Sequence, residues 1–109
     1  MAFTTDELDF KKTPYKQIEL NSNNELLEFY ENSLKEAREY LKLENEKMLS
    51  NTWILQSGET VYKIFTKEEV LRQCLNQTIH HRAQLGVYLR LLDVSVPATY
   101  GNSADDISF

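Results

Sequence analysis

Gln77 and His81 are the residues whose types and spacing suggest chemistry most directly. They are four positions apart, so on a helix both side chains project from one face and could meet one metal ion. Imidazole suits zinc, nickel, iron and copper, whereas the amide oxygen of Gln is a weak, neutral ligand that these ions rarely select. The alternative is that Gln77 hydrogen-bonds to His81 within packed helices, which satisfies both polar groups without an ion.

Neighbouring residues offer further candidates. His80 lies about 100° around the helix from His81, which favours a solvent-facing or interface position. Arg82 and Arg90 are expected to form salt bridges with an acidic helix elsewhere in the chain, with anion binding as the alternative. Cys74 lies in the apolar stripe described below, where a buried, unreactive thiol is expected. The chain has no Gly-rich phosphate loop, Cys-x-x-Cys pair or Ser-His-Asp order.

The element that must position these residues is a long second helix. Residues 66–69 read Thr-Lys-Glu-Glu, which is a capping box at a helix start. One stripe at spacings of three or four then runs through Val70, Cys74, Gln77, His81, Leu85 (or Gln84), Tyr88 and Leu92. The helix is expected to end near Asp93, because Pro97 and turn-forming residues follow.

A first helix is predicted from about residue 24 to about residue 47. Residues 21–24 are candidate N-caps, and an apolar stripe follows at Leu27, Tyr30, Leu34, Ala37 and Leu41. Residues 1–23 lack a sustained period and are expected to form an extended arm, which leaves residues 24–109 as the helical domain. Between the helices, residues 53–64 hold two β-prone runs around Ser57 and Gly58, consistent with a small hairpin or an irregular connector.

Composition limits the possible classes of protein. A chain of 109 residues with 41% hydrophobic and 27% charged residues has room for one globular domain. With 17 acidic and 12 basic residues it carries a net charge of −5, which disfavours nucleic acid as a partner. No stretch approaches the roughly 20 apolar residues that cross a bilayer, and no secretion signal is visible. We therefore expect a cytoplasmic protein with no nucleic-acid or membrane partner.

Two amphipathic helices bury little on each other, and helical bundles usually close with four helices. The sequence therefore predicts an all-α fold that is half of a four-helix bundle, with two long helices joined by a short connector. A homodimer would complete it.

Residues 76–92 and 96–106 carry a specific resemblance. They closely resemble the C-terminal signature of the DinB-like (damage-inducible) family, which reads N-H-x-x-H-H-R-x-Q-L-x-V-Y-L-R and then V-P-x-x-Y-G-x-S-A-D. The resemblance implies a four-helix bundle, often dimeric, with a divalent metal held by three His. Two of those ligands come from the signature helix, and the second matches His81 while the first falls on Gln77. The third comes from an earlier helix, so the resemblance implies the C-terminal half of the family bundle with a degenerate metal site.

The family includes metal-dependent hydrolases and, among relatives, thiol transferases. From this resemblance we expect a truncated or divergent member that dimerises and is not catalytic. It would hold no cofactor, or only weakly bind zinc, nickel or manganese at His81 and Gln77. The alternative is a metal-dependent hydrolase or transferase whose site a partner or dimer mate completes around His81. A third interpretation is that the gene product carries two more helices upstream. The sequence specifies no substrate, and whether the protein is an enzyme stays open between these alternatives.

Overall fold

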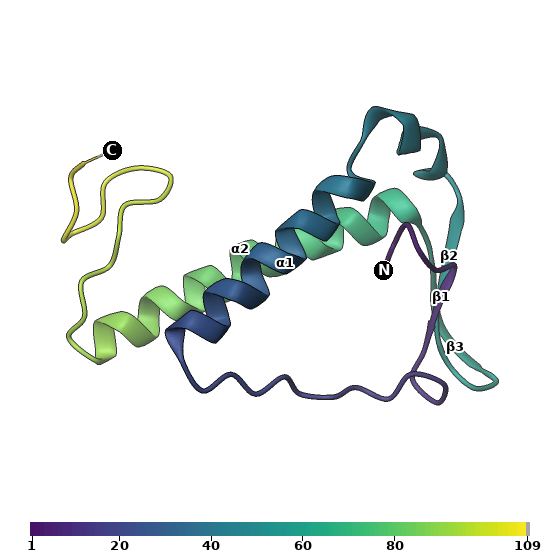
Figure 1. Cartoon of the computed structure of the whole chain (residues 1–109), viewed down its shortest axis with the longest axis horizontal. Helices are drawn as coiled ribbons and strands as arrows, with labels where there is room; N and C mark the ends of the chain where they lie inside the picture. The colour runs from purple at the N-terminus through teal and green to yellow at the C-terminus, as the bar shows by residue number, and fades with distance from the viewer. Residues whose placement is uncertain (109) are drawn as a thin grey trace. The chain divides into compact units, whose positions relative to one another are not determined.

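A computed structural model describes residues 1–108, which divide into two compact units, residues 1–71 and the segment from Arg72 onward. The predicted all-α fold is wrong, because a three-stranded mixed sheet accompanies the helices. In chain order the elements are β1 (Glu7–Asp9), α1 (Asn23–Tyr40), a 3₁₀ helix (Leu43–Met48), β2 (Thr52–Ser57), β3 (Thr60–Thr66) and α2 (Lys67–Leu91) (Figure 1).

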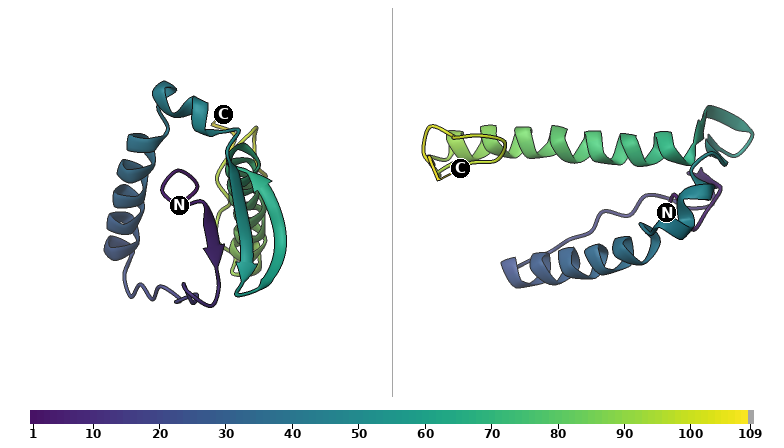
Figure 2. Two further views of the ribbon diagram at one scale, coloured as in Figure 1. Left: turned by 90° about the vertical axis from the view of Figure 1, so that its right-hand side faces the viewer. Right: turned by 90° about the horizontal axis from the view of Figure 1, so that it is seen from above.

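The sheet has the strand order β1-β2-β3. β2 and β3 form an antiparallel hairpin, with Trp53 opposite Phe65 and an irregularity between Leu55 and Gln56. β1 lies alongside β2 as a parallel strand, with Leu8 opposite Leu55; Figure 2 shows this pairing and the curvature of the hairpin. Of the two alternatives for residues 53–64, the hairpin is confirmed. β1 arises inside the segment that was expected to be an extended arm.

A polar cluster fixes the N-terminal segment to the start of α2. The Lys67 side chain is only 2% exposed, and its Nζ lies 2.7 Å from Asp6 Oδ1 and donates to the carbonyl of Thr5 at 3.0 Å. The buried Trp53 donates from Nε1 to Thr5 Oγ1 at 3.3 Å. The clustered partners satisfy a buried ammonium, which would otherwise be costly to remove from water.

A buried carboxylate joins β1 to the hairpin turn. Asp9 Oδ1 accepts backbone hydrogen bonds from Gly58 and Lys11, each at 2.9 Å. These hydrogen bonds, and most of all the one from the Gly58 amide, hold the pKa of the Asp9 carboxyl below its ordinary value. Gly58 has φ of +60°, and a Cβ there would come 2.8 Å from Lys11 Cδ. A side chain at position 58 would therefore strain the turn that Asp9 holds.

α1 begins at a capping box. Ser22 Oγ accepts from the Glu25 amide at 3.2 Å, and Glu25 Oε2 accepts from the Asn21 amide at 2.8 Å. The helix ends at Tyr40 and not near residue 47 as predicted. The physical reason is visible at its end, where Asn45 Nδ2 donates to the carbonyl of Tyr40 at 2.8 Å. This bond satisfies a terminal carbonyl, and the chain continues as the 3₁₀ helix.

The predicted start of α2 is confirmed. Thr66 Oγ1 accepts from the Glu69 amide at 3.2 Å, and Glu69 Oε2 accepts from the Thr66 amide at 2.8 Å. At the other end Asp93 adopts a left-handed conformation with φ of 56°. The Val94 amide then donates to the carbonyl of Leu89 at 2.9 Å, which closes the last turn.

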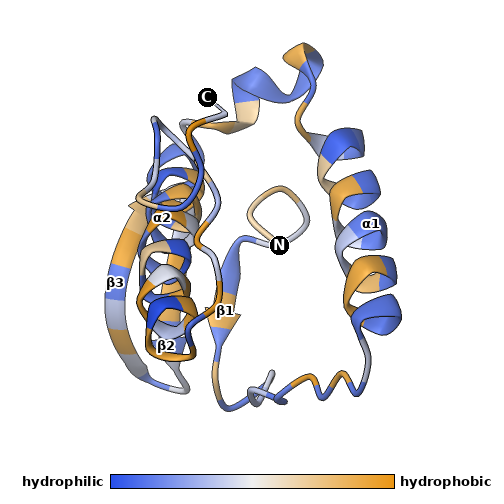
Figure 3. Cartoon of the chain, turned by 90° about the vertical axis from the view of Figure 1, so that its left-hand side faces the viewer, coloured by the Kyte–Doolittle hydropathy of each residue, from blue (hydrophilic) through white to orange (hydrophobic). Residues whose placement is uncertain are grey.

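The apolar stripes of both long helices are not buried in the structure. Within residues 1–108 the buried apolar residues are Ala2 and Trp53, and neither belongs to a helix. On α1, Leu27 and Tyr30 are 60% and 57% exposed. Figure 3 shows hydrophobic and hydrophilic residues alternating along both helices. No helix among residues 1–108 has the length and apolar content to span a membrane.

Candidate functional site

His81 and Gln77 both lie on the exposed middle of α2. The hydrogen bond of the His81 imidazole runs from Nδ1 to Gln84 Oε1 at 3.0 Å, so the partner is Gln84 and not the expected Gln77. The His80 ring meets the His81 ring edge-on, with centroids 5.2 Å apart. Gln84 lies three residues after His81, and this helical spacing is the sequence signal that would have indicated it.

The contact with Gln84 suits one tautomer of the His81 imidazole. In the tautomer with the proton on Nδ1, that atom donates to Gln84 Oε1 and Nε2 keeps a lone pair. That lone pair could accept a hydrogen bond or bind one metal coordination position. Nowhere in the described part of the chain do three or more His, Cys, Asp or Glu side chains group so as to hold an ion. The residues present therefore do not fit the three-His site that the family resemblance implies.

Cys74 is exposed on α2, contrary to the expected burial. The Thr78 hydroxyl donates to the carbonyl of Cys74 at 3.1 Å, so this contact involves the Cys74 backbone and not its thiol. The thiol is thus accessible on the helix surface.

Within α2, Arg82 and Arg90 contact the C-terminal segment and not an acidic helix as predicted. Arg90 forms a two-pronged ion pair with Asp105, with Nη1 and Nη2 at 3.0 and 2.8 Å from its oxygens. The Arg82 guanidinium lies over the Tyr100 ring at 4.2 Å from its centroid. Neither Arg is therefore presented as an open anion site.

Adjacent carboxylates hold the C-terminal segment in place. Asp105 also accepts a hydrogen bond from the Val96 amide at 3.0 Å. The hydrogen bond from Arg90 is the main reason that the pKa of the Asp105 carboxyl is lowered. Asp106 accepts from the Ala98 amide at 2.9 Å and from the Ser108 hydroxyl, which most strongly lowers the pKa of Asp106. These bonds organise loop backbone, which is a structural role that the sequence reading did not identify.

The hollow beside this loop is small. It has a volume of about 90 Å³ and is lined mainly by the apolar residues Leu85, Leu89, Val96 and Pro97. Pockets for small-molecule substrates usually measure about 300–1,000 Å³. This hollow is too small for such a substrate.

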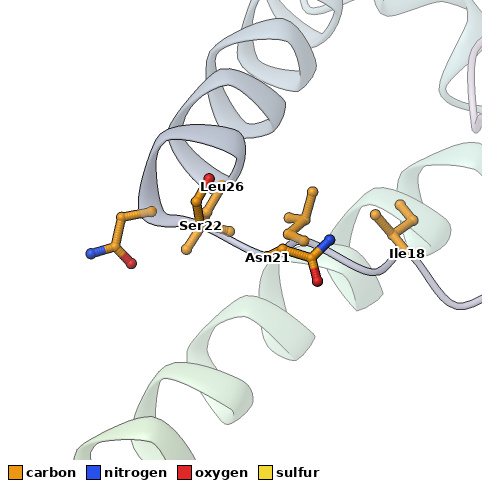
Figure 4. Close-up of a pocket in the computed structure, with 6 residues that line it drawn as sticks. Ile18, Asn21, Ser22 and Leu26 are labelled. Carbon is orange, nitrogen blue, oxygen red and sulfur yellow. The ribbon is translucent and has the colours of Figure 1, made fainter.

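Larger hollows have linings that do not include His81. One of about 410 Å³ lies at the start of α1, where Ile18, Asn21, Ser22 and Leu26 line it (Figure 4). It contains no ionisable side chain, and so offers a surface for contact and no catalytic group.

Comparison with protein families gives a match over most of the chain. A model of the DinB family matches residues 2–107, so the similarity extends well upstream of the signature helix and spans nearly the whole chain. No curated protein and no solved structure matches the chain.

Proposed function

Because the chain belongs to the DinB family, we propose that it is a non-catalytic member that acts by self-association. The observation that carries this proposal is the exposure of the α1 stripe, where Leu27, Tyr30 and Leu41 are 60%, 57% and 62% exposed. An apolar helix face of this kind is typical of a surface that packs against a partner.

The chemistry around His81 supports the non-catalytic half of the proposal. A catalytic metal usually has three protein ligands and one open position. Here the position four residues before His81 is Gln77, whose side chain is an amide, and His81 Nδ1 is hydrogen-bonded to Gln84. One imidazole with an amide neighbour is a poor basis for tight metal binding.

The expected association is weak. Each of these three exposed side chains contributes on the order of 1–2 kcal/mol when its remaining surface is buried. Six such residues across two copies supply about 6–12 kcal/mol, which is comparable with the cost of association, about 4–15 kcal/mol. We therefore expect a dissociation constant in the micromolar range or above, and a concentration-dependent mass.

The experiment is sedimentation velocity over a wide range of concentrations on wild type, Leu27→Asn and Glu28→Asn. Both substitutions are at exposed positions of α1, so neither should unfold the chain. Wild type and Glu28→Asn should approach twice the monomer mass, whereas Leu27→Asn should stay lower. A monomer mass for wild type at every concentration would contradict self-association.

The second candidate is a metal-dependent hydrolase or transferase whose site a partner completes around His81. The observation that favours it is the contact of His81 Nδ1 with Gln84, which, in the tautomer protonated at Nδ1, leaves Nε2 with a lone pair for a metal. Elemental analysis after loading with zinc, nickel or manganese and dialysis tests this candidate. A retained ion per chain or per two chains, lost in His81→Ala, would support the enzyme and overturn the non-catalytic proposal.

A further inference from the structure

The dipeptide Asn-Ser occurs three times in this chain, at residues 21–22, 32–33 and 102–103. Asn is a chemically labile residue, and it can lose its amide group without an enzyme when a small residue follows it. We propose that Asn21 is a site of spontaneous deamidation in the folded protein, whereas hydrogen bonds of the backbone protect Asn32 and Asn102. The following residue is Ser in each pair, so the backbone surroundings distinguish the three sites. This inference does not depend on self-association.

The reaction forms one bond and breaks another at the side-chain carbonyl carbon Cγ of Asn. The backbone nitrogen of the next residue gives its proton to solvent base and bonds to Cγ, while the side-chain nitrogen takes up a proton and leaves as ammonia. Water then opens the resulting cyclic imide at either of its carbonyl groups. Opening gives Asp or isoaspartate, whose main chain runs through the former side chain. Water is the co-reactant, and no atom is oxidised or reduced.

The backbone nitrogen of Ser22 is available for this attack. Ser22 precedes α1 with φ of −149° and ψ of 158°, and within residues 1–108 its N–H donates no hydrogen bond. Its carbonyl accepts from the Leu26 amide and its hydroxyl accepts from the Glu25 amide. The cap of α1 therefore uses the other polar groups of Ser22 and leaves its N–H to solvent, where the proton is readily lost.

The surroundings of Asn21 leave room for ring closure and for water. Asn21 is exposed and lies in a stretch without helix or strand. Together with Ser22 it lines the hollow of about 410 Å³ at the start of α1 (Figure 4). Its backbone N–H donates to Glu25 Oε2 at 2.8 Å, but in the described part of the chain its side-chain amide has no hydrogen bond. The side chain can therefore turn toward the Ser22 nitrogen.

The other two Asn-Ser pairs have an attacking nitrogen that is already engaged. The N–H of Ser103 donates to the carbonyl of Asp106 at 2.9 Å. Asn32 and Ser33 lie inside α1, where the amide of each residue donates to the carbonyl four residues earlier. At both sites a hydrogen bond must break before the nitrogen can reach Cγ. Deamidation of Asn32 and Asn102 should therefore be slower than that of Asn21.

The isoaspartate product would disturb the start of α1. It places one additional main-chain carbon between the nitrogen of residue 21 and Ser22, so the N–H that Glu25 accepts is displaced from the capping box. The Asp product keeps the ordinary main chain and can keep this hydrogen bond. Loss of the cap should loosen the first turn of the helix, which includes the bond from the Leu26 amide to the Ser22 carbonyl.

The test follows all three pairs in one sample of the full chain, incubated in mildly alkaline buffer. Mass spectrometry of peptides detects the change from amide to acid, and fragmentation assigns it to Asn21 as opposed to the nearby Asn23 or Asn24. In the folded chain Asn21 should convert about 5–10-fold faster than Asn32 and Asn102, the factor that one backbone hydrogen bond represents. The matched control is the same chain in urea, where all three backbone nitrogens are free and the rates should converge.

Equal rates at Asn21 and Asn102 in the folded chain would overturn the proposal. A difference that persists unchanged in urea would also overturn it, because flanking residues and not hydrogen bonds would then set the rates. Asn21→Gln should remove the fast conversion and leave the other two rates as in wild type. Chain enriched in isoaspartate at position 21 should lose hydrogen-exchange protection at the Leu26 amide, whereas Asn21→Asp should keep it. Equal protection in these two proteins would contradict the effect on the capping box.

Discussion

The buried Lys67 ammonium gives a prediction that can be worked out in magnitude. Lys67 is 2% exposed, whereas its ion-pair partner Asp6 is 85% exposed at the side chain. The perturbations are Lys67→Met, which keeps the apolar stem, and Asp6→Asn, which keeps an oxygen acceptor but removes the charge. The two single variants and the double variant form a double-mutant cycle.

The burial of the Lys67–Asp6 ion pair sets the expected change in the free energy of unfolding. An exposed ion pair contributes about 0–1 kcal/mol, and breaking a fully buried one costs about 3–5 kcal/mol. The Lys67–Asp6 pair is buried at one end only, and the Thr5 carbonyl still accepts from Lys67 after Asp6 is changed. We therefore expect Asp6→Asn to lower the free energy of unfolding by about 1 kcal/mol in the wild type and by almost nothing beside Lys67→Met.

Urea unfolding followed by Trp53 fluorescence is the assay. Trp53 is the single Trp and hydrogen-bonds to Thr5, so it reports on this cluster. With a slope of about 1 kcal/mol per molar urea, the expected midpoint shift is about 1 M. Lys16→Met, at an exposed position, is the control and should leave the midpoint unchanged. An equal loss of unfolding free energy from Asp6→Asn in wild type and in Lys67→Met would refute the reasoning.

Three further outcomes are expected. Gly58→Ala should lower the free energy of unfolding by about 1–2 kcal/mol, because φ at this position is +60°. Adding Lys11→Ala should remove the close contact between the new Cβ and the Lys11 side chain but not the backbone strain. An unchanged urea midpoint for Gly58→Ala would contradict this prediction. Because folding lowers the pKa of Asp9, its contribution is present above the ordinary value of 3.8 and is lost as the pH falls through the folded value. Wild type should therefore lose stability more steeply than Asp9→Asn as the pH falls. Parallel curves of unfolding free energy against pH for the two proteins would contradict this prediction. Asp105→Asn should loosen the C-terminal segment from Arg90 and speed its proteolysis, with an unchanged cleavage rate as the contrary result.

The starts of both long helices could be predicted because they depend on residues close together in the chain. Ser22 with Glu25 and Thr66 with Glu69 are three apart, and their hydrogen bonds form as the spacing predicts. The end of α1 could not be predicted in the same way. It depends on the Asn45 amide reaching back to Tyr40, and an Asn in a helical stretch does not reveal that choice.

The strand β1 escaped prediction for a different reason. β1 has three residues, which is too short for an alternating pattern. Its pairing partner Leu55 is far along the chain from Leu8, and a parallel pair depends on such long-range contacts. The Arg90–Asp105 pair crosses an irregular loop, so no periodic spacing indicated it either. At the candidate site the residue types were evident, but the choice of Gln84 over Gln77 as the partner of His81 required the structure.

These contacts make local stability and association separable in this protein. Polar contacts of high specificity lie at the two ends of α2, at Lys67 and at Arg90, whereas its middle presents apolar side chains such as Leu75. Substitutions at the ends should therefore change unfolding or proteolysis and leave the mass measured by sedimentation unchanged at concentrations where the chain is folded. Substitutions on the exposed stripes should do the reverse, since a side chain already in water contributes little to the folding of one chain. If Lys67→Met and Leu27→Asn changed both properties in proportion, folding and association would be one coupled event, and the helices would not exist as a preformed docking surface.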